Sequence, residues 1–564
     1  MNRPSDSLPL KAVKAALKEE KAQNDALRIT IAMLEQRVAA HATLEQRIAQ
    51  LEEELRLLRA KQYGPSSEKR KDRTFNEAEQ VAADDEGEDV EGEEENESGD
   101  ESAEAHDPRH VVPDTGRPTR DKQKKPGKKR GRKPISPDLK RVTVAYELEG
   151  DERLCPCCQE QMHRMGETAT EQVHIEIKIV VRKNVRGKYA CRNCERTGTS
   201  NSVVLAPMPP QPLPGSVATA STLAWVLASK FVDGMPLYRM SSVLKRADVE
   251  ISRGTLGHWV IQSSERHLQR IYDILHELLR GQNYIHGDET RVQVLKEDGR
   301  EAQDQSYMWV YRSMDGSTEP IVLFDYQPGR GKIYPQAFLG NFSGKLMSDG
   351  YEAWRSAFPD ATHLGCFAHS RRKFTDTVKA NKKPGKLAAE ALALIGALYD
   401  VEYLAREGNP GELSRDDYIL HMRQQHSVPV LEAFKKWLEE KEPQVLPSSK
   451  LGQAISYTLN QWDHLILYTS DPRAPIDNNA VEREIKNFVV GRKGWLFSDT
   501  VRGATASAVI YSLALTCRAC GVNPQAWFAH ALTQLPCRGP DADLEDLLPW
   551  NFLAEENVAA HNSG

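Results

Sequence analysis

Near the start of the chain, apolar residues recur at gaps that alternate between four and three residues. The series is Leu27, Ile31, Leu34, Val38, Leu44, Ile48, Leu51, Leu55 and Leu58. This spacing places one apolar seam along a helix and predicts a coiled coil over residues 8–63 that joins copies of the chain into a homo-oligomer. Only His41 holds the seam between Val38 and Leu44, so we expect local overwinding there. One long amphipathic helix folded back on its own domain is the alternative.

Residues 64–135 have a composition that does not form a core, because they are highly charged and poor in large apolar residues. They are acidic at 77–104 and end in a basic run. We therefore predict a disordered linker, in which Arg130 and Arg132 enter a narrow A·T minor groove and Lys133 meets phosphate. A solvated tail is one alternative. Another is that the acidic block occupies the basic one when DNA is absent.

Four cysteines form two pairs with the two-residue gap of metal knuckles: Cys155, Cys158, Cys191 and Cys194. The segment between the pairs alternates apolar and polar residues as short strands do, so residues 136–205 are predicted to form a zinc ribbon that binds DNA. Four thiolates at about 2.3 Å satisfy Zn²⁺ and leave no open position, so the ion would be structural. Cys157 is a further thiol that could replace one of the four.

Residues 206–280 contain a proline-rich connector and then show helical periodicity. Met240 and Leu244 fill one predicted helix, and Ser252 caps a second that contains Leu256. The pattern resembles a helix-turn-helix and would place the second helix on DNA. Plain helix packing is the alternative, because the second helix carries no basic cluster.

Residues 281–375 are predicted to form a sheet. Alternation and turn residues predict strands at 283–295, 306–313, 320–326, 345–349 and 363–369. Three antiparallel strands followed by strands that alternate with helices is the order expected of an RNase H-like sheet. In that sheet Asp288 on the first strand and Asp349 at the end of the fourth lie side by side.

The stretch around Glu482 is predicted to be a helix of about a dozen residues. Asp477 or Asn478 can cap its first turn, and Gly491 supplies a stop. The apolar stripe of this helix leaves Glu482 at its edge, where a catalytic carboxylate would face a cleft.

Other interpretations of the same residues stay open. Glu482 could form a solvated ion pair with Lys486, and Glu484 is a competing carboxylate on nearly the opposite helical face. Cys366 and His369 have metal-like spacing, but no second pair accompanies them, so we interpret His369 as a strand end near DNA. Basic residues expected to meet DNA phosphates are Arg371, Arg372, Lys373, Arg483, Lys486, Arg492 and Lys493.

Taken together, the patterns predict a multidomain α+β protein. It would have an N-terminal coiled coil, a zinc ribbon, a helical helix-turn-helix-like region and an RNase H-like α/β catalytic domain. That catalytic domain comprises 281–375 and 471–505, with a helical insertion at 376–470 and a C-terminal helical element at 506–564.

Composition limits the class of protein. The 564 residues include 39% hydrophobic ones, enough for several cores, and carry a net charge of −6. No run approaches the roughly 18 apolar residues that a membrane span needs. Nine cysteines are too few for a disulfide scaffold in this length. We therefore expect a soluble, cytoplasmic protein with no membrane partner.

Four motifs carry a resemblance to a known family. At Asp288, at Ser348 to Tyr351, at Cys366 to Phe374 and at Asn478 to Arg483, the chain resembles the insertion-sequence sixty-six family of DDE transposases. The resemblance spans nearly the whole chain. It implies that Asp288, Asp349 and Glu482 form a metal-binding catalytic triad. It also implies small accessory proteins encoded by the same element.

The chemistry that such a triad performs needs hard oxygen ligands. Two Mg²⁺ or Mn²⁺ ions about 3.5–4 Å apart can activate a nucleophile and stabilise a leaving 3′ oxygen. The expected function is cleavage at the terminal inverted repeats of an insertion sequence, followed by transfer of the 3′-OH into target DNA. The alternative is a non-catalytic zinc-ribbon regulator derived from a transposase, which binds DNA and does not cut it.

Overall fold

The structure of the chain is a computed structural model that describes residues 111–115, 141–146, parts of 157–192, 203–380 and 386–552. The predicted coiled coil, almost all of the linker with Arg130, Arg132 and Lys133, and the two cysteines Cys155 and Cys194 lie outside the described residues. The chain divides into two compact units, of which the smaller is Thr119–Met208. In the described ranges, no helix combines the length and the apolar character needed to cross a membrane.

In the smaller unit, the described regular structure is one antiparallel strand pair. β1 (Lys188–Ala190) pairs with β2 (Val203–Leu205), with Lys188 opposite Leu205. Cys158 and Cys191, one from each predicted knuckle, are exposed. The strand pair lies at the second knuckle, where the sequence predicts strand alternation.

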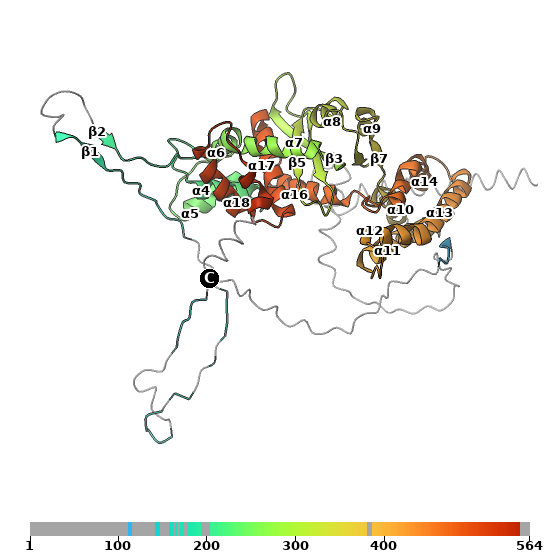
Figure 1. The fold of residues 1–564 in the computed structure, drawn as a ribbon, viewed down its shortest axis with the longest axis horizontal. Helices are drawn as coiled ribbons and strands as arrows, with labels where there is room; N and C mark the ends of the chain where they lie inside the picture. Colours follow the sequence, from blue (N-terminus) through green and yellow to red (C-terminus); the bar gives the residue numbers. More distant parts are fainter. Residues whose placement is uncertain are drawn as a thin grey trace, which may run out of the picture. The chain divides into compact units, whose positions relative to one another are not determined.

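The larger unit is built on a mixed sheet (Figure 1). Its strands are β3 (Tyr284–Lys296), β4 (Gln305–Ser313), β5 (Val322–Gln327), β6 (Lys345–Met347), β7 (Thr362–Leu364) and β8 (Ser498–Thr500). The order across the sheet is β5-β4-β3-β6-β7, and β8 adds to the far end of β3. β3, β4 and β5 are antiparallel, whereas β6 and β7 run parallel to β3. The predicted strand adjacency is therefore confirmed.

A helix protects the β5 edge of the sheet. α17 (Val501–Ala519) lies along β5 and supplies hydroxyl groups where another strand would supply backbone groups. Ser512 Oγ accepts from the Phe324 N–H at 2.7 Å, and Thr516 Oγ1 accepts from the Val322 N–H at 3.0 Å. These bonds satisfy the edge strand, which removes a template for pairing with other chains.

Helices occupy the segment in which the sequence predicts a helix-turn-helix-like region. They are α4 (Ala220–Phe231), α5 (Leu237–Arg246), α6 (Arg253–Ser263), the π-helical turn η3 (Ser264–Leu268) and α7 (Gln269–Arg280). Met240 and Leu256 are buried, and Ser252 Oγ accepts from the Thr255 N–H at 3.1 Å, which caps α6. The helical arrangement is confirmed, and its contact with DNA stays a prediction.

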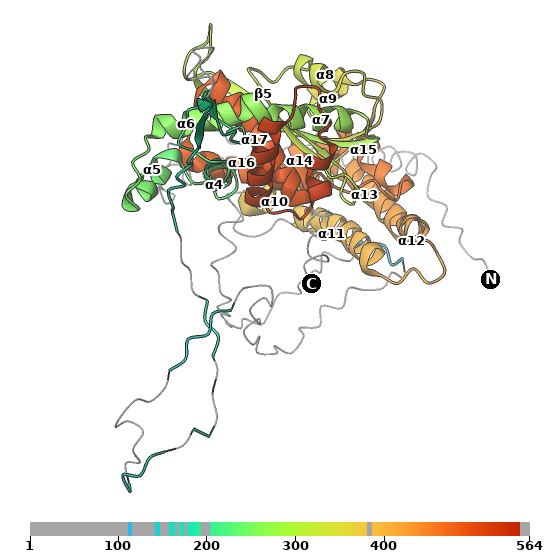
Figure 2. The same ribbon diagram turned by 60° about the vertical axis from the view of Figure 1, so that its left-hand side comes forward.

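The expected insertion is helical in its described residues and gathers beyond the β7 edge (Figures 1 and 2). Its elements are α11 (Lys386–Glu407), α12 (Arg415–Met422), η4 (Arg423–Ser427), α13 (Val428–Lys441), η5 (Glu442–Gln444), α14 (Lys450–Asn460), α15 (Trp462–Leu465) and η6 (Ile466–Ser470). Val111 and Val112 of the predicted linker pack against its apolar core. The prediction of disorder was wrong for this short segment, because these two valines have an apolar surface to cover.

The strand predicted at 363–369 is too long. β7 ends at Leu364, and α10 (Phe367–Ala380) begins two residues after Gly365. Phe367 and Phe374 are both fully buried at a spacing of seven residues, which is a helical period. The short alternation before Phe367 therefore does not extend to His369, which lies in the first turn of α10.

The helix predicted to end at Gly491 continues to Trp495. α16 (Asn479–Trp495) is followed by its C-cap residue Leu496, whose φ is +68°. Gly491 instead permits close packing, since an added Cβ would lie 2.4 Å from the Tyr511 hydroxyl of α17. The glycine marks a contact between two helices and not a helix end.

The remaining helices complete the layers around the sheet. They are α8 (Ile333–Leu339), α9 (Glu352–Ala357), α18 (Pro524–Gln534), η7 (Leu535–Cys537) and η8 (Glu545–Leu547). Trp354 of α9 covers Gly287 of β3, where an added Cβ would lie 2.5 Å from the indole ring. The residue before Asp288 must therefore be a glycine for α9 to pack so closely.

Candidate carboxylate and metal site

The sheet brings Asp288 and Asp349 together. β3 and β6 are parallel neighbours in which His286 pairs with Met347, and each aspartate lies two residues further along its chain. One carboxylate oxygen from each aspartate, together with one from Glu289, lies within 4.8 Å of the others. Asp288 is 7% exposed. The two aspartates therefore meet at one edge of the sheet, as the sequence predicts.

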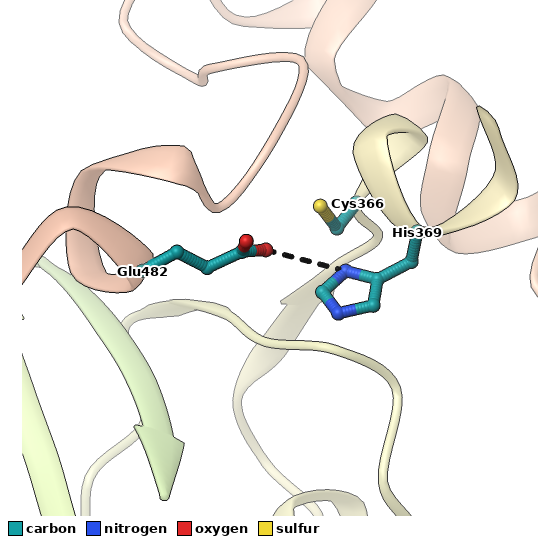
Figure 3. Close-up of side chains that lie close together, drawn as sticks. All are labelled: Cys366, His369 and Glu482. Carbon is teal, nitrogen blue, oxygen red and sulfur yellow. Dashed lines mark ion pairs between the residues drawn. The ribbon is translucent and has the colours of Figure 1, made fainter. Parts of the chain in front are cut away.

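Glu482 reaches the same place from α16, which packs on β3. Its side chain is buried, 4% exposed, and its Oε2 accepts from Arg372 Nη2 at 3.2 Å. His369 Nδ1 lies 3.7 Å from Glu482 Oε1, the contact drawn in Figure 3. Such burial rules out the solvated ion pair with Lys486. Glu484 turns instead to Arg312, with 3.5 Å between Oε1 and Nε.

The acidic residues repel one another in a buried environment. Burial raises the pKa of Asp288 well above its ordinary value. The charges of three neighbouring carboxylates, Glu289, Asp349 and Glu482, raise it further. Glu482 is therefore among the charges that act on Asp288. A divalent cation between these oxygens would relieve the repulsion, and a set of hard oxygen donors suits Mg²⁺ or Mn²⁺.

Glu289 is a member of the cluster that the sequence did not identify. It is 3% exposed, and Arg330 contacts it with 2.5 Å between Nη2 and Oε1. Burial raises the pKa of Glu289 to about 7, the charge of Asp349 adds to this rise, and Arg330 opposes it. Strand alternation predicts that Glu289 points away from Asp288. The structure nevertheless brings Glu289 to both aspartates, and Arg330 lies near Asp349 as well, with 4.0 Å between Nη2 and Oδ2.

Asn478 joins the helix of Glu482 to the strand of Asp288. It is fully buried, and its Nδ2 donates to the Gly287 carbonyl at 3.2 Å. His286 Nδ1 donates to Asn478 Oδ1 at 2.8 Å, because that oxygen can only accept. Of the two residues expected to cap the helix, Asp477 does so, because its Oδ1 accepts the Asn479 N–H at 3.1 Å, whereas the Asn478 side chain makes the contacts above.

The N–H of Asn478 makes a further contact, with Cys366. It donates to Cys366 Sγ at 3.1 Å. Cys366 lies just before α10. Burial raises the pKa of its thiol, and the charge and hydrogen bond of His369 oppose part of this rise. One ligand atom each from Cys366, His369 and Glu482 lies within 4.8 Å of the others. His369 thus has a partner set that its spacing to Cys366 alone did not indicate.

The basic residues expected to meet DNA occupy different settings. Arg372 is 17% exposed and binds Glu482, and Arg492 Nη1 donates to the Arg291 carbonyl. Arg483 is largely exposed and lies 3.5 Å from Asp315. The ammonium of Lys373 lies 4.6 Å from the centre of the Tyr457 ring. Arg372 is therefore part of the carboxylate site, whereas the phosphate contacts of this group stay predictions.

Family models match most of the chain. The model described as Transposase IS66 family matches residues 215–506, and the IS66 C-terminal element matches 512–550. Upstream, the model described as Transposase C of IS166 homeodomain matches 50–144. The zinc-finger binding domain of transposase IS66 matches 152–195, a range that spans both predicted cysteine pairs and supports a structural zinc.

Relatives with similar sequences occur in Sinorhizobium fredii. Uncharacterized protein y4jD is 33% identical over 426 residues, which cover 72% of this chain and 80% of that protein. Uncharacterized protein y4qI is 27% identical over 566 residues, which cover 97% of each. The similarity to y4qI therefore extends over nearly the full length of both chains.

Proposed function

Because the chain belongs to the transposase IS66 family, we propose that it is a DDE transposase that cuts DNA at insertion-sequence ends and joins the freed 3′-OH to target DNA. Asp288, Asp349 and Glu482 are its catalytic carboxylates. The observation that carries this proposal is that Asp288 and Asp349 meet on neighbouring strands while the helix of Glu482 packs on β3, so that its charge acts on Asp288. The strand order, with three antiparallel strands and two parallel ones, supports an RNase H-like catalytic domain.

The residues present fit a divalent cation. The cluster offers several buried carboxylates, and Glu482 Oε1 has no hydrogen-bond partner among the described residues. Mg²⁺ or Mn²⁺ held by the three carboxylates would activate a nucleophile and stabilise the leaving oxygen in a phosphoryl displacement. Such a reaction needs no covalent link between enzyme and DNA.

Hydrogen bonds from neighbouring backbone and side-chain groups orient the carboxylates. Asp288 Oδ1 accepts from the Glu289 N–H at 2.8 Å, and Asp349 Oδ1 accepts from the Tyr351 N–H at 2.8 Å. Each bond fixes one oxygen and directs the other toward the cluster. Asn478 performs the same task for the whole of α16. Orientation of this kind lowers the entropic cost of reaching a reactive arrangement.

DNA binding and assembly belong to the rest of the chain. The helix-turn-helix, the zinc ribbon with Cys155, Cys158, Cys191 and Cys194, and the basic linker would hold terminal repeats and target DNA. The N-terminal coiled coil would join copies of the chain on paired ends, with small accessory proteins of the same element as further partners. A soluble, cytoplasmic location follows from this function.

The test is cleavage of DNA that carries the flanks of this gene, with Mg²⁺ or Mn²⁺ and purified full-length protein. Cuts at inverted repeats are expected for the wild type and are expected to be lost in Glu482→Gln and Asp349→Asn. Glu484→Gln is the matched control, because it removes a carboxylate that lies on the same helix but contacts Arg312. It should cut like the wild type.

A wild type that binds these flanks but never cuts them would overturn the proposal, provided that the neighbouring gene products are also supplied. The chain would then be a regulator that binds DNA. Equal cleavage by the wild type and the Glu482→Gln variant would instead remove Glu482 from the catalytic set.

A further inference from the structure

Cys366, His369 and Glu482 form a second group of ligands beside the three catalytic carboxylates. Cys366 follows β7, His369 lies in the first turn of α10, and Glu482 lies in the first turn of α16. Each is at most 5% exposed, and their ligand atoms lie within 4.8 Å of one another. In Figure 3 the thiol, the imidazole and the carboxylate turn toward one another.

The donor atoms differ in kind from those of Asp288 and Asp349. A sulfur, an imidazole nitrogen and a carboxylate oxygen are a mixed set that suits Zn²⁺ or another borderline-soft cation better than Mg²⁺. Around a tetrahedral zinc, a nitrogen and an oxygen ligand are separated by about 3.3–3.5 Å. His369 Nδ1 and Glu482 Oε1, at 3.7 Å, need to approach by only a few tenths of an ångström to reach this separation.

The surroundings leave the right atom of Glu482 available. Arg372 binds Oε2, and Oε1 is a buried carboxylate oxygen without a hydrogen-bond partner among the described residues. Leaving such an oxygen buried is costly unless a cation or donor satisfies it. A zinc ion would do so, and its charge would balance those of one thiolate and one carboxylate.

The neighbouring residues also orient the thiol. The N–H of Asn478 donates to Cys366 Sγ, and Asn478 is itself fixed by His286 and Gly287. Outer contacts of this kind hold metal ligands in place and are typical of zinc sites. Three protein ligands would leave a fourth position open, which distinguishes this site from the closed four-cysteine site of a ribbon.

We propose that Cys366, His369 and Glu482 bind one Zn²⁺ ion, or a cation of the same class such as Co²⁺ or Cd²⁺, separately from the zinc finger. Binding itself does not depend on the proposed transposase activity. A consequence that does depend on it is competition, because Glu482 belongs to both ligand sets. Zn²⁺ at this site would draw Glu482 from the aspartates and lower Mg²⁺-dependent cleavage.

The experiment measures zinc per chain in full-length protein without DNA, after equilibration with Zn²⁺ and removal of free metal. Cys366→Ala is expected to bind about one equivalent fewer than the wild type. Cys517→Ala is the matched control, because Cys517 is an equally buried cysteine in α17, on an element that carries none of the three ligands. It should retain the wild-type content. Circular dichroism checks that each variant is folded.

A second measurement needs no variant at Cys366. Cadmium nuclear magnetic resonance of the Cd²⁺-loaded wild type should give a signal typical of one sulfur ligand beside the signal of the sulfur-rich finger. Glu482→Gln, which keeps the shape of the side chain, should weaken or remove only that signal. The proposal would be overturned by equal zinc content in the wild type, Cys366→Ala and Cys517→Ala. A wild-type cadmium spectrum that contains only the sulfur-rich signals would overturn it as well. Neither outcome would bear on cleavage with Mg²⁺.

Discussion

The side-chain amide of Asn478 donates to the carbonyl of Gly287 at 3.2 Å. This bond ties the start of α16, which carries Glu482, to the residue before Asp288. A buried amide that joins two catalytic elements sets the distance between their carboxylates. The bond therefore links the packing of the fold to the arrangement of the site.

Removal of this amide should impair cleavage more than folding. In Asn478→Ala we expect about a 100-fold slower cleavage, because displacements of about 1 Å have that effect on catalysis. The free energy of unfolding should fall by about 1–3 kcal/mol through the lost buried bonds. Rates are measured on end-containing DNA, and unfolding by urea. Asn487→Ala is the control on the same helix: this half-buried side chain bonds the Arg483 carbonyl and Arg518, so cleavage should stay at the wild-type rate. Wild-type cleavage by Asn478→Ala would show that the bond does not position Glu482.

The contact between Gly491 and Tyr511 predicts a reciprocal pair of variants. Gly491→Ala should lower the free energy of unfolding by about 1–3 kcal/mol, because the new methyl group would overlap the Tyr511 hydroxyl. Tyr511→Phe removes that oxygen and leaves the nearest ring carbon at 3.6 Å. The double variant should therefore regain most of the lost stability. Additive losses in thermal unfolding would show that the hydroxyl is not the obstacle.

Arg423 predicts a large loss of stability in the helical insertion. It is 1% exposed, binds both carboxylate oxygens of Glu402 at 2.7 Å and donates to three backbone carbonyls within 468–474. Arg423→Met should cost about 3–5 kcal/mol, because Glu402 would stay buried without its partner. Arg406, which is 55% exposed and lies 3.9 Å from the same carboxylate, provides the control. Arg406→Met should cost less than about 1 kcal/mol in denaturant unfolding; similar losses in both would contradict this account.

Asp325 of β5 predicts a pH dependence of stability. Burial raises its pKa to about 6 from 3.8, against the opposing hydrogen bond of Gln327. Between these values the folded chain holds more protons than the unfolded chain, so this residue lowers stability as pH rises through 6. Asp325→Asn should raise the free energy of unfolding by up to about 3 kcal/mol at pH 8 and have little effect near pH 4. The exposed Asp541→Asn should show no such difference, and a pH-independent effect of Asp325→Asn would refute the assignment.

The sequence predicted the sheet and its two aspartates because those features depend on local patterns. Alternation of apolar and polar residues locates β3 and β6. Because these strands are parallel neighbours, residues at their matching ends, here Asp288 and Asp349, lie together. Glu482 needed more than pattern, since a helical edge position is compatible with a surface ion pair. The family motif selected it over Glu484.

Other features depend on contacts between distant residues, which a single sequence does not reveal. Glu289 joins the cluster although strand alternation points it away from Asp288, and Arg330 reaches it from a loop. Asn478 was one of two candidates for the helix cap because asparagine often serves there, yet its side-chain partners lie on β3. Gly491 was assigned to a helix end for the same kind of reason. A residue type indicates which roles are possible, and its neighbours in space decide between them.

The clamp between His286 and Asn478 joins residues 192 positions apart in the chain. During synthesis at roughly 5–20 residues per second, β3 emerges about 10–40 seconds before α16. Asp349 follows Asp288 by 61 residues, and Glu482 follows Asp349 by 133. For roughly the last 7–27 seconds of that interval the nascent chain holds both aspartates without Glu482 and without the amide that positions it. A partly synthesised chain is therefore unable to assemble the complete set of carboxylates, and the timing of translation separates the folding of the sheet from the completion of the site.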